Sequence, residues 1–166
     1  MLSVLEYCLP ESAQRYIGDL EADPRGRKYI RALSHLEDCT LYESGGACVD
    51  FHLYVELVID EVMQECPVDA KTVVSVNEVS RSPLSVEVAS GLAIIVYELA
   101  QNSALHAFSL DSPANYLRVI SSVENNADSP GATYTLTVRD NGQGLHEDSL
   151  DQAPSGTGLA LAKAIA

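Results

Sequence analysis

The sequence predicts an α/β (α+β) two-layer sandwich, in which a mixed sheet carries helices on one face and a helical segment precedes the sandwich. Helical and β-branched stretches follow one another in the order helix, strand, helix, strand, strand, helix. A turn-forming run between the last two strands indicates an antiparallel hairpin. The chain has 166 residues, of which 46% are apolar, enough for one buried core. We expect a helical segment over residues 1–44 and the sandwich over residues 45–166.

Two helices are expected in the first part of the chain. Glu11–Leu20 is a short amphipathic piece. Asp23 and Pro24 then indicate the N-cap and first position of a helix from about Arg25 to Tyr42. Its apolar positions are expected to face a partner element, and they are Tyr29, Leu33, Leu36 and Leu41.

The middle of the chain predicts helix, strand and helix after a loop over 43–46. Apolar residues at helical spacing run from Phe51 to Val62, and Pro67 ends that helix. Thr72–Val79 is rich in β-branched residues and indicates a strand. Ser82 and Pro83 are expected to open a third helix that continues to about Phe108.

The C-terminal part predicts a hairpin, a loop and a helix. The strands are Tyr116–Val123 and Ala132–Arg139, and the run Asn125–Gly131 joins them. A loop from Asp140 to Ser155 then leads to an alanine-rich helix from Gly156 to the end.

Charge and composition narrow the function classes. The net charge of −14 repels phosphate backbones, so we expect no nucleic-acid partner. No apolar run reaches the roughly 18 residues of a membrane span, and the N-terminus carries no basic signal region. The four cysteines form no CxxC pair, which is typical of reduced thiols in a cytoplasmic protein. A bound nucleotide would have to be held by local groups.

Polar residues follow one face of the third helix. Glu98, Asn102 and His106 lie four residues apart, so they span only about 80° of an α-helix. They lie beside an apolar stripe that is expected to pack on the sheet, namely Val88, Leu92, Ile95 and Leu99. A metal-bound polyphosphate would satisfy these groups, because an amide oxygen suits Mg²⁺, a carboxylate orients a reactant and an imidazole approaches phosphate. The alternative is a stripe that simply reaches solvent.

Two glycine-rich turns complete the pattern. Asp140 ends a strand and is followed by Gly142 and Gly144, so a carboxylate able to accept from an exocyclic amine such as adenine's lies beside a flexible backbone. Gly156, Thr157 and Gly158 open the last helix, where free N–H groups favour an anion. Each turn alone is also typical of an ordinary turn or cap. Together with Asn102 they are expected to surround one cavity.

The order and spacing of these motifs resemble the ATP-binding domain of sensor histidine kinases, in the GHKL superfamily with its Bergerat ATP-binding fold. Glu98–Asn102 with His106–Ala107 resembles the N box of that family. The run Asp140–Gly144 resembles its first glycine box, and Gly156–Leu161 its second. Upstream, the likeness extends to kinases of the HWE and related (HisKA_2-like) subfamily, through Leu41–Tyr42, Val49–Phe51 and the helix after them.

The resemblance implies a role for each residue and implies ATP and Mg²⁺ as cofactors. Asn102 would coordinate Mg²⁺, and Glu98 would assist phosphoryl transfer. Asp140 would contact the adenine amine, with Gly142 and Gly144 shaping the base pocket. The second glycine box would cradle phosphate through Gly156, Thr157 and Gly158. Residues 1–44 would correspond to part of a dimerisation and phosphotransfer hairpin, and homodimerisation through these helices is expected. The resemblance also implies a further strand after the last helix, so we expect either that the sheet lacks this last strand or that the sequence is a fragment.

The sequence departs from the family at the phosphoacceptor. The first 34 residues contain no histidine, and His35 falls in what would be the second helix of the hairpin. We therefore expect a histidine kinase domain whose acceptor histidine lies outside this chain, with a response regulator or phosphoacceptor protein as partner. Two alternatives stay open: a serine kinase of the anti-sigma-factor type, and a non-catalytic module that docks a response regulator.

Overall fold

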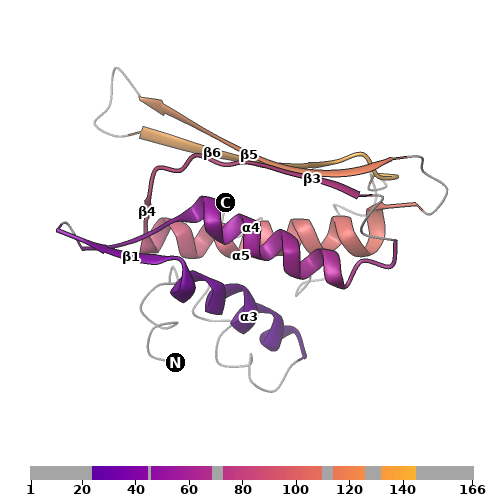
Figure 1. Ribbon diagram of the computed structural model, residues 1–166, viewed down its shortest axis with the longest axis horizontal. Coiled ribbons are helices and arrows are strands. Elements are labelled where there is room, and N and C mark those ends of the chain that lie inside the picture. The colour runs from indigo at the N-terminus through magenta and orange to yellow at the C-terminus, as the bar shows by residue number, and fades with distance from the viewer. Residues whose placement is uncertain (1–23, 45, 69–72, 110–113, 126–131, 145–166) are drawn as a thin grey trace, which may run out of the picture.

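The computed structural model describes residues 24–44, 46–68, 73–109, 114–125 and 132–144. The main sheet forms one layer, helices α4 and α5 the next, and α3 lies beyond them (Figure 1). In chain order the elements are α3 (Pro24–Asp38), β1 (Thr40–Glu43), β2 (Gly46–Val49), α4 (Phe51–Gln64), β3 (Val73–Glu78), β4 (Leu84–Ser85), α5 (Val86–Asn102), the π-helical turn η2 (Ser103–Ala107), β5 (Asn115–Asn125) and β6 (Ala132–Asp140).

The main sheet is mixed, as predicted. Its central strand β5 runs parallel to β3 and antiparallel to β6, so that Ile120 lies opposite Glu78 on one side and Thr137 on the other. Along β5, Leu117 and Val119 are fully buried while Tyr116 is exposed, because successive side chains point to opposite faces. Among the described elements the helices pack on one face of this sheet, which confirms the predicted fold class.

The core lies where α4 and α5 pack beneath that sheet. Tyr54 is fully buried, stacks on Phe51 with ring centroids 5.2 Å apart, and donates its hydroxyl to the carbonyl of Ala93 at 3.1 Å. Small side chains on α5 allow the helices to approach closely, and the buried ones are Ala89, Ala93 and Ala100. The predicted helix over Phe51–Val62 is thus confirmed, and its apolar face is the centre of the core.

By length and composition alone, the stretch Val86–Ala107 is long and apolar enough to cross a membrane. Its most apolar 18-residue window has a mean hydropathy of 1.2. In the structure, however, 61% of its most apolar window is buried inside the fold, and the buried residues include Glu98. Its composition is accounted for by its position between the sheet and helix α3, since a helix that is covered on several sides is apolar on several sides.

The first described helix is shorter than predicted. Leu33 and Leu36 are buried, as expected, but α3 ends at Asp38 and residues 40–43 form strand β1. Leu41 pairs with Cys48 of β2 and is 43% exposed, so the prediction that it continues the helical face is wrong. The helical pattern is a local signal, whereas this strand forms because a second strand lies beside it. The predicted piece Glu11–Leu20 lies outside the described residues.

The third helix begins later than predicted. Leu84 and Ser85 pair with Val49 and Cys48, which holds the chain extended past Pro83. Helix α5 therefore starts at Val86, and Ser85 becomes its N-cap. The small sheet β1-β2-β4 at this end joins the start of α5 to the hairpin that follows α3. The predicted strand at 72–79 and the predicted hairpin strands are confirmed as β3, β5 and β6.

Replacing Asp50 with alanine is expected to lower the free energy of unfolding by about 1 kcal/mol. The Asp50 carboxylate accepts from the backbone N–H of Leu53 at 3.0 Å and thereby caps α4, the helix at the centre of the core. Ser85→Ala is the matched comparison, since that cap bond is longer, 3.4 Å, and should contribute less. Urea unfolding of both variants measures the difference; a larger loss for Ser85→Ala would contradict this assignment.

Candidate functional site

A buried hydrogen bond joins the end of strand β6 to the end of helix α5. The Ser103 hydroxyl, which belongs to a side chain only 4% exposed, donates to Oδ2 of Asp140 at 2.7 Å. The second oxygen of that carboxylate, Oδ1, accepts from the backbone N–H of Gly142 at 2.9 Å. Because Asn102 immediately precedes Ser103, the predicted site residues Asn102 and Asp140 lie at the same end of the sandwich.

The turn after β6 packs tightly on the π-helical turn η2. A Cβ added to Gly142 would lie 2.4 Å from both the Cβ and the carbonyl oxygen of Ala107. Gln143 reinforces the contact, since its backbone N–H donates to Ala107 O at 3.2 Å and its side-chain amide donates to His106 O at 2.9 Å. Gly144 has a φ of +74°, a conformation that favours glycine. The first glycine motif thus serves close packing at Gly142 and backbone conformation at Gly144.

Asn141 extends the main sheet beyond its last strand pair. Its Oδ1 accepts from the backbone N–H of Tyr116 at 2.8 Å, and its Nδ2 donates to the carbonyl of Ala114 at 2.9 Å. The side-chain amide therefore pairs with the start of β5 as a peptide group of a neighbouring strand would. This anchoring holds the chain in place immediately after Asp140.

The three polar residues of the third helix have different surroundings. Glu98 is only 2% exposed, Asn102 is half-buried and His106 is exposed. Helix α5 ends at Asn102, and η2 follows with hydrogen bonds that span five residues, so His106 departs from the α-helical spacing assumed for it. The structure therefore keeps Glu98 and Asn102 on one α-helical face, while His106 lies in the π-helical turn with its side chain exposed.

Two residues of this junction were missed by the sequence reasoning. Ser103 contacts the Asp140 carboxylate, and Gln143 fastens the glycine turn to η2. A usable signal existed for Ser103, because a hydroxyl within an otherwise apolar helix needs a hydrogen-bond partner once it is buried. Gln143 carried no comparable signal, since its contacts depend on where the turn meets the helix.

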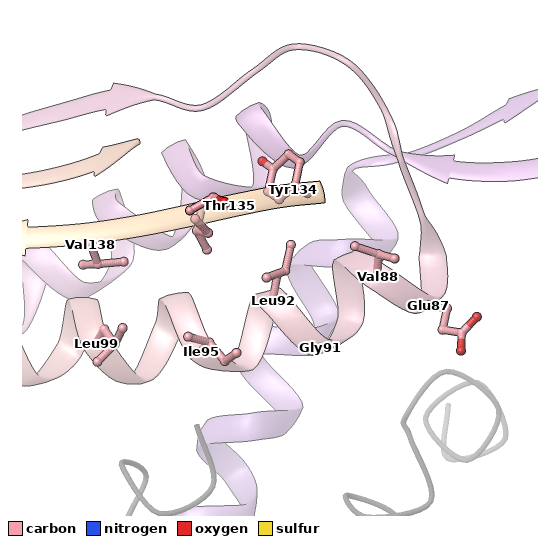
Figure 2. A pocket seen from close by; sticks show the side chains of 10 residues that line it. Glu87, Val88, Gly91, Leu92, Ile95, Leu99, Tyr134, Thr135 and Val138 are labelled. Atoms are coloured by element: carbon pink, nitrogen blue, oxygen red, sulfur yellow. The ribbon is translucent and has the colours of Figure 1, made fainter. Parts of the chain in front are cut away.

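An apolar groove lies between helix α5 and strand β6. The predicted stripe faces strand β6, as expected, but it does not pack closely against the strand and leaves a space of about 490 Å³ (Figure 2). The residues lining the groove are Glu87, Val88, Gly91, Leu92, Ile95 and Leu99 of α5 with Tyr134, Thr135, Leu136 and Val138 of β6. The stripe thus forms one wall of an open groove at the edge of the described sheet.

Gly156, Thr157 and Gly158 lie outside the described residues, as does the whole predicted helix from Gly156 to the end. The expectation that their amides share a cavity with Asn102 and Asp140 therefore stays a prediction.

A second polar cluster docks α3 onto the helical layer. Nε2 of His35 lies 2.5 Å from Oε2 of Glu61, and the Tyr97 hydroxyl donates to Oε1 of Glu61 at 3.4 Å. Arg31 lies 3.6 Å from Glu61 and 3.3 Å from Glu65. Burial, and secondarily the charge of Glu61, raises the pKa of Tyr97 to about 12, so this phenol stays protonated and can donate. His35 is thus engaged between two helices.

The residues at the junction fit a nucleotide with a divalent cation. An ionised carboxylate offers about four acceptor positions, and the two described donors leave Asp140 capacity for a ligand amine. The half-buried Asn102 side chain makes no capping hydrogen bond to η2, and an amide oxygen is a type of ligand that Mg²⁺ accepts. The close approach at Gly142 leaves no room there for a side chain.

Comparison with known proteins supports the fold. No family model matches the sequence, and no curated protein matches it. The chain is similar to the solved histidine kinase domain from the Erythrobacter litoralis EL346 blue-light activated histidine kinase, with a TM-score of 0.70 and 17% identity, covering 99% of this chain and 79% of that one. It is also similar to the structure described as the Erythrobacter litoralis EL346 blue-light activated histidine kinase, with a TM-score of 0.64 and 19% identity, covering 85% of this chain and 46% of that one. At these identities the likeness shows the fold, in agreement with the resemblance found in the sequence.

Proposed function

We propose that this chain is the ATP-binding catalytic domain of a cytoplasmic histidine-kinase-type protein, and that it transfers the γ-phosphoryl group of ATP to a histidine in two-component signalling. The observation that carries the proposal is the contact between Ser103 and Asp140, 37 residues apart, at 2.7 Å. This contact brings together the end of the N-box-like helix and the carboxylate of the glycine-box-like turn. The fold shared with histidine kinase domains adds support.

The proposed chemistry relies on positioning rather than on a covalent intermediate. Asp140 would accept from the adenine amine, and Asn102 would hold Mg²⁺, which neutralises charge on the phosphates. Within the described ranges no group of three or more His, Cys, Asp or Glu side chains gathers as a metal site. The cation would therefore take most of its ligands from phosphate oxygens and water, as Mg²⁺ commonly does. Glu98 would orient the acceptor, with His106 near the phosphates.

The acceptor histidine is proposed to belong to a partner protein. His35 lies against Glu61 at the contact between α3 and α4, where its Nε2 is already engaged. A response regulator would receive the phosphoryl group in turn, and dimerisation through the N-terminal helices would bring two such domains together. The HWE subfamily is proposed on the sequence resemblance alone.

Replacing Asn102 with alanine is expected to weaken Mg²⁺-dependent binding of a non-hydrolysable ATP analogue about tenfold, the scale of losing part of a metal's ligand environment. Titration calorimetry in Mg²⁺ and in EDTA measures the effect. The matched control is Gln101→Ala on the same helical turn, because that amide donates to Glu65 at 3.3 Å instead. Equal Mg²⁺ dependence in Asn102→Ala and in the unaltered protein would contradict the metal assignment.

A transfer assay separates the proposed function from its alternatives. The chain is incubated with ATP labelled in the γ-phosphate, with and without candidate acceptor proteins. Label on a partner histidine supports the proposal, and it is recognised because phosphohistidine is acid-labile. Label on a partner serine, which is acid-stable, identifies a serine kinase, and nucleotide binding without label on any partner identifies a docking module.

A further inference from the structure

We propose that Ser103 is a positioning residue for Asp140, and that it sharpens the preference of the site for an amino-bearing purine over a keto-bearing one. The inference rests on the proposed function, because it concerns how Asp140 selects the base. It begins from a contact that the motif pattern does not include, the 2.7 Å hydrogen bond from the Ser103 hydroxyl to Oδ2 of Asp140.

The Ser103 hydroxyl has two acceptors within reach and one proton. Besides Asp140, the carbonyl oxygen of Leu99 lies 3.0 Å away. A hydrogen bond to an ionised acceptor is roughly twice as strong as one to a neutral acceptor, and the carboxylate is also the nearer of the two. The proton therefore goes to Asp140, and Ser103 differs from a serine that merely bonds back to its own helix.

Ser90 shows what such an ordinary helix serine looks like. It lies on α5, the helix that leads into η2, is 1% exposed and donates to the carbonyl of Val86 at 2.7 Å, four residues back. Ser90 and Ser103 are thus both buried, and each has a backbone carbonyl four residues back within hydrogen-bond distance. Ser103 has in addition an acceptor on another element, which makes Ser90 a matched control.

Two donors from separate elements hold the Asp140 carboxylate. Ser103 approaches Oδ2 from η2, and Gly142 N approaches Oδ1 from the turn after β6. Bonds to both oxygens fix the plane of the group, so its remaining acceptor positions point in set directions. A group that is held before its ligand arrives loses less conformational freedom on binding. Asp140 is therefore ready to accept from a base amine.

A fixed carboxylate also discriminates between bases that carry an amine and bases that carry a keto group. An exocyclic amine donates to it, whereas a keto oxygen at the same position of the base meets it with like partial charge and leaves an acceptor unsatisfied. Without the Ser103 bond the carboxylate can rotate away from a keto group, and it can also tolerate an amine that is less well aligned. The difference in binding affinity between the two bases then becomes smaller. Loss of the Ser103 hydroxyl should thus affect adenine and hypoxanthine nucleotides unequally.

The test compares the affinities of ATP and inosine triphosphate for the full chain in Mg²⁺, by titration calorimetry. We expect Ser103→Ala to weaken ATP binding about fivefold while inosine triphosphate binding changes less than about twofold, the scale of one hydrogen bond. Ser103→Thr keeps the hydroxyl and should retain the ATP preference. Ser90→Ala should retain it as well, which separates positioning from helix stability.

Each outcome has a distinct meaning. An unchanged ATP preference in Ser103→Ala overturns the positioning role and leaves the proposed function intact. Equal weakening of both nucleotides likewise overturns it, because a purely structural role would act so. Binding of neither nucleotide by the unaltered chain overturns the proposed function and this inference together.

Discussion

Gly142→Ala is expected to lower the free energy of unfolding by about 3 kcal/mol, since it overpacks a contact that has no room to adjust. The new Cβ would lie 2.4 Å from the carbonyl oxygen of Ala107 and 2.6 Å from its carbonyl carbon, and these are backbone atoms. Relief requires the turn to move away from η2, which would also break the bond from Gln143 N to Ala107 O. Urea unfolding monitored by circular dichroism measures the loss.

Gly144→Ala is the control two residues further on. A Cβ there meets nothing within 4 Å, and the φ of +74° is the only obstacle. The cost should be about 1–2 kcal/mol, the penalty of a left-handed conformation. If Gly144→Ala destabilised the protein more than Gly142→Ala, the close packing of the turn on Ala107 would be refuted.

Asp140→Asn is expected to weaken binding of an ATP analogue by about 1–3 kcal/mol, which is about five- to 150-fold in Kd. The new amide would present a donor where the base amine needs an acceptor. The fold should tolerate the change, because the Ser103 hydroxyl can turn to Leu99 O at 3.0 Å and accept from the asparagine amide. Isothermal titration together with thermal unfolding measures affinity and stability separately.

Asp60→Asn removes the same unit of charge from an exposed position of α4 and serves as the control. The net charge of −14 repels any nucleotide, so an effect of overall charge would raise affinity slightly in both variants. Equal affinity of Asp140→Asn and the unaltered chain would count against Asp140 as the group that reads the base.

Elements with a strong local pattern could be predicted from the sequence. Apolar residues at helical spacing between Phe51 and Val62 predicted α4, and β-branched runs around a turn predicted β5 and β6. These signals are local because helix hydrogen bonds and hairpin turns join residues close in the chain. The predicted fold class followed from their order.

The short strands could not be predicted in the same way. Residues 40–43 continue the helical pattern of α3, and Leu84–Ser85 follow a proline that was expected to open a helix. Both segments are extended because β2 lies beside them, and a β pair is stabilised by its partner across space rather than by its own sequence. The π-helical turn over Ser103–Ala107 likewise carries no pattern distinct from that of an α-helix.

The candidate site likewise has a part that the sequence predicted and a part that only the structure showed. The sequence alone predicted the residues that suit a nucleotide, because their chemistry and order resemble a known family. These residues are Asn102, Asp140 and the glycines that follow Asp140. Only the tertiary structure showed that Ser103 holds the Asp140 carboxylate and that Gly142 lies against Ala107. Such contacts join residues dozens of positions apart. They depend on how the sheet and the helical layer pack against each other, and a local sequence pattern does not determine that packing.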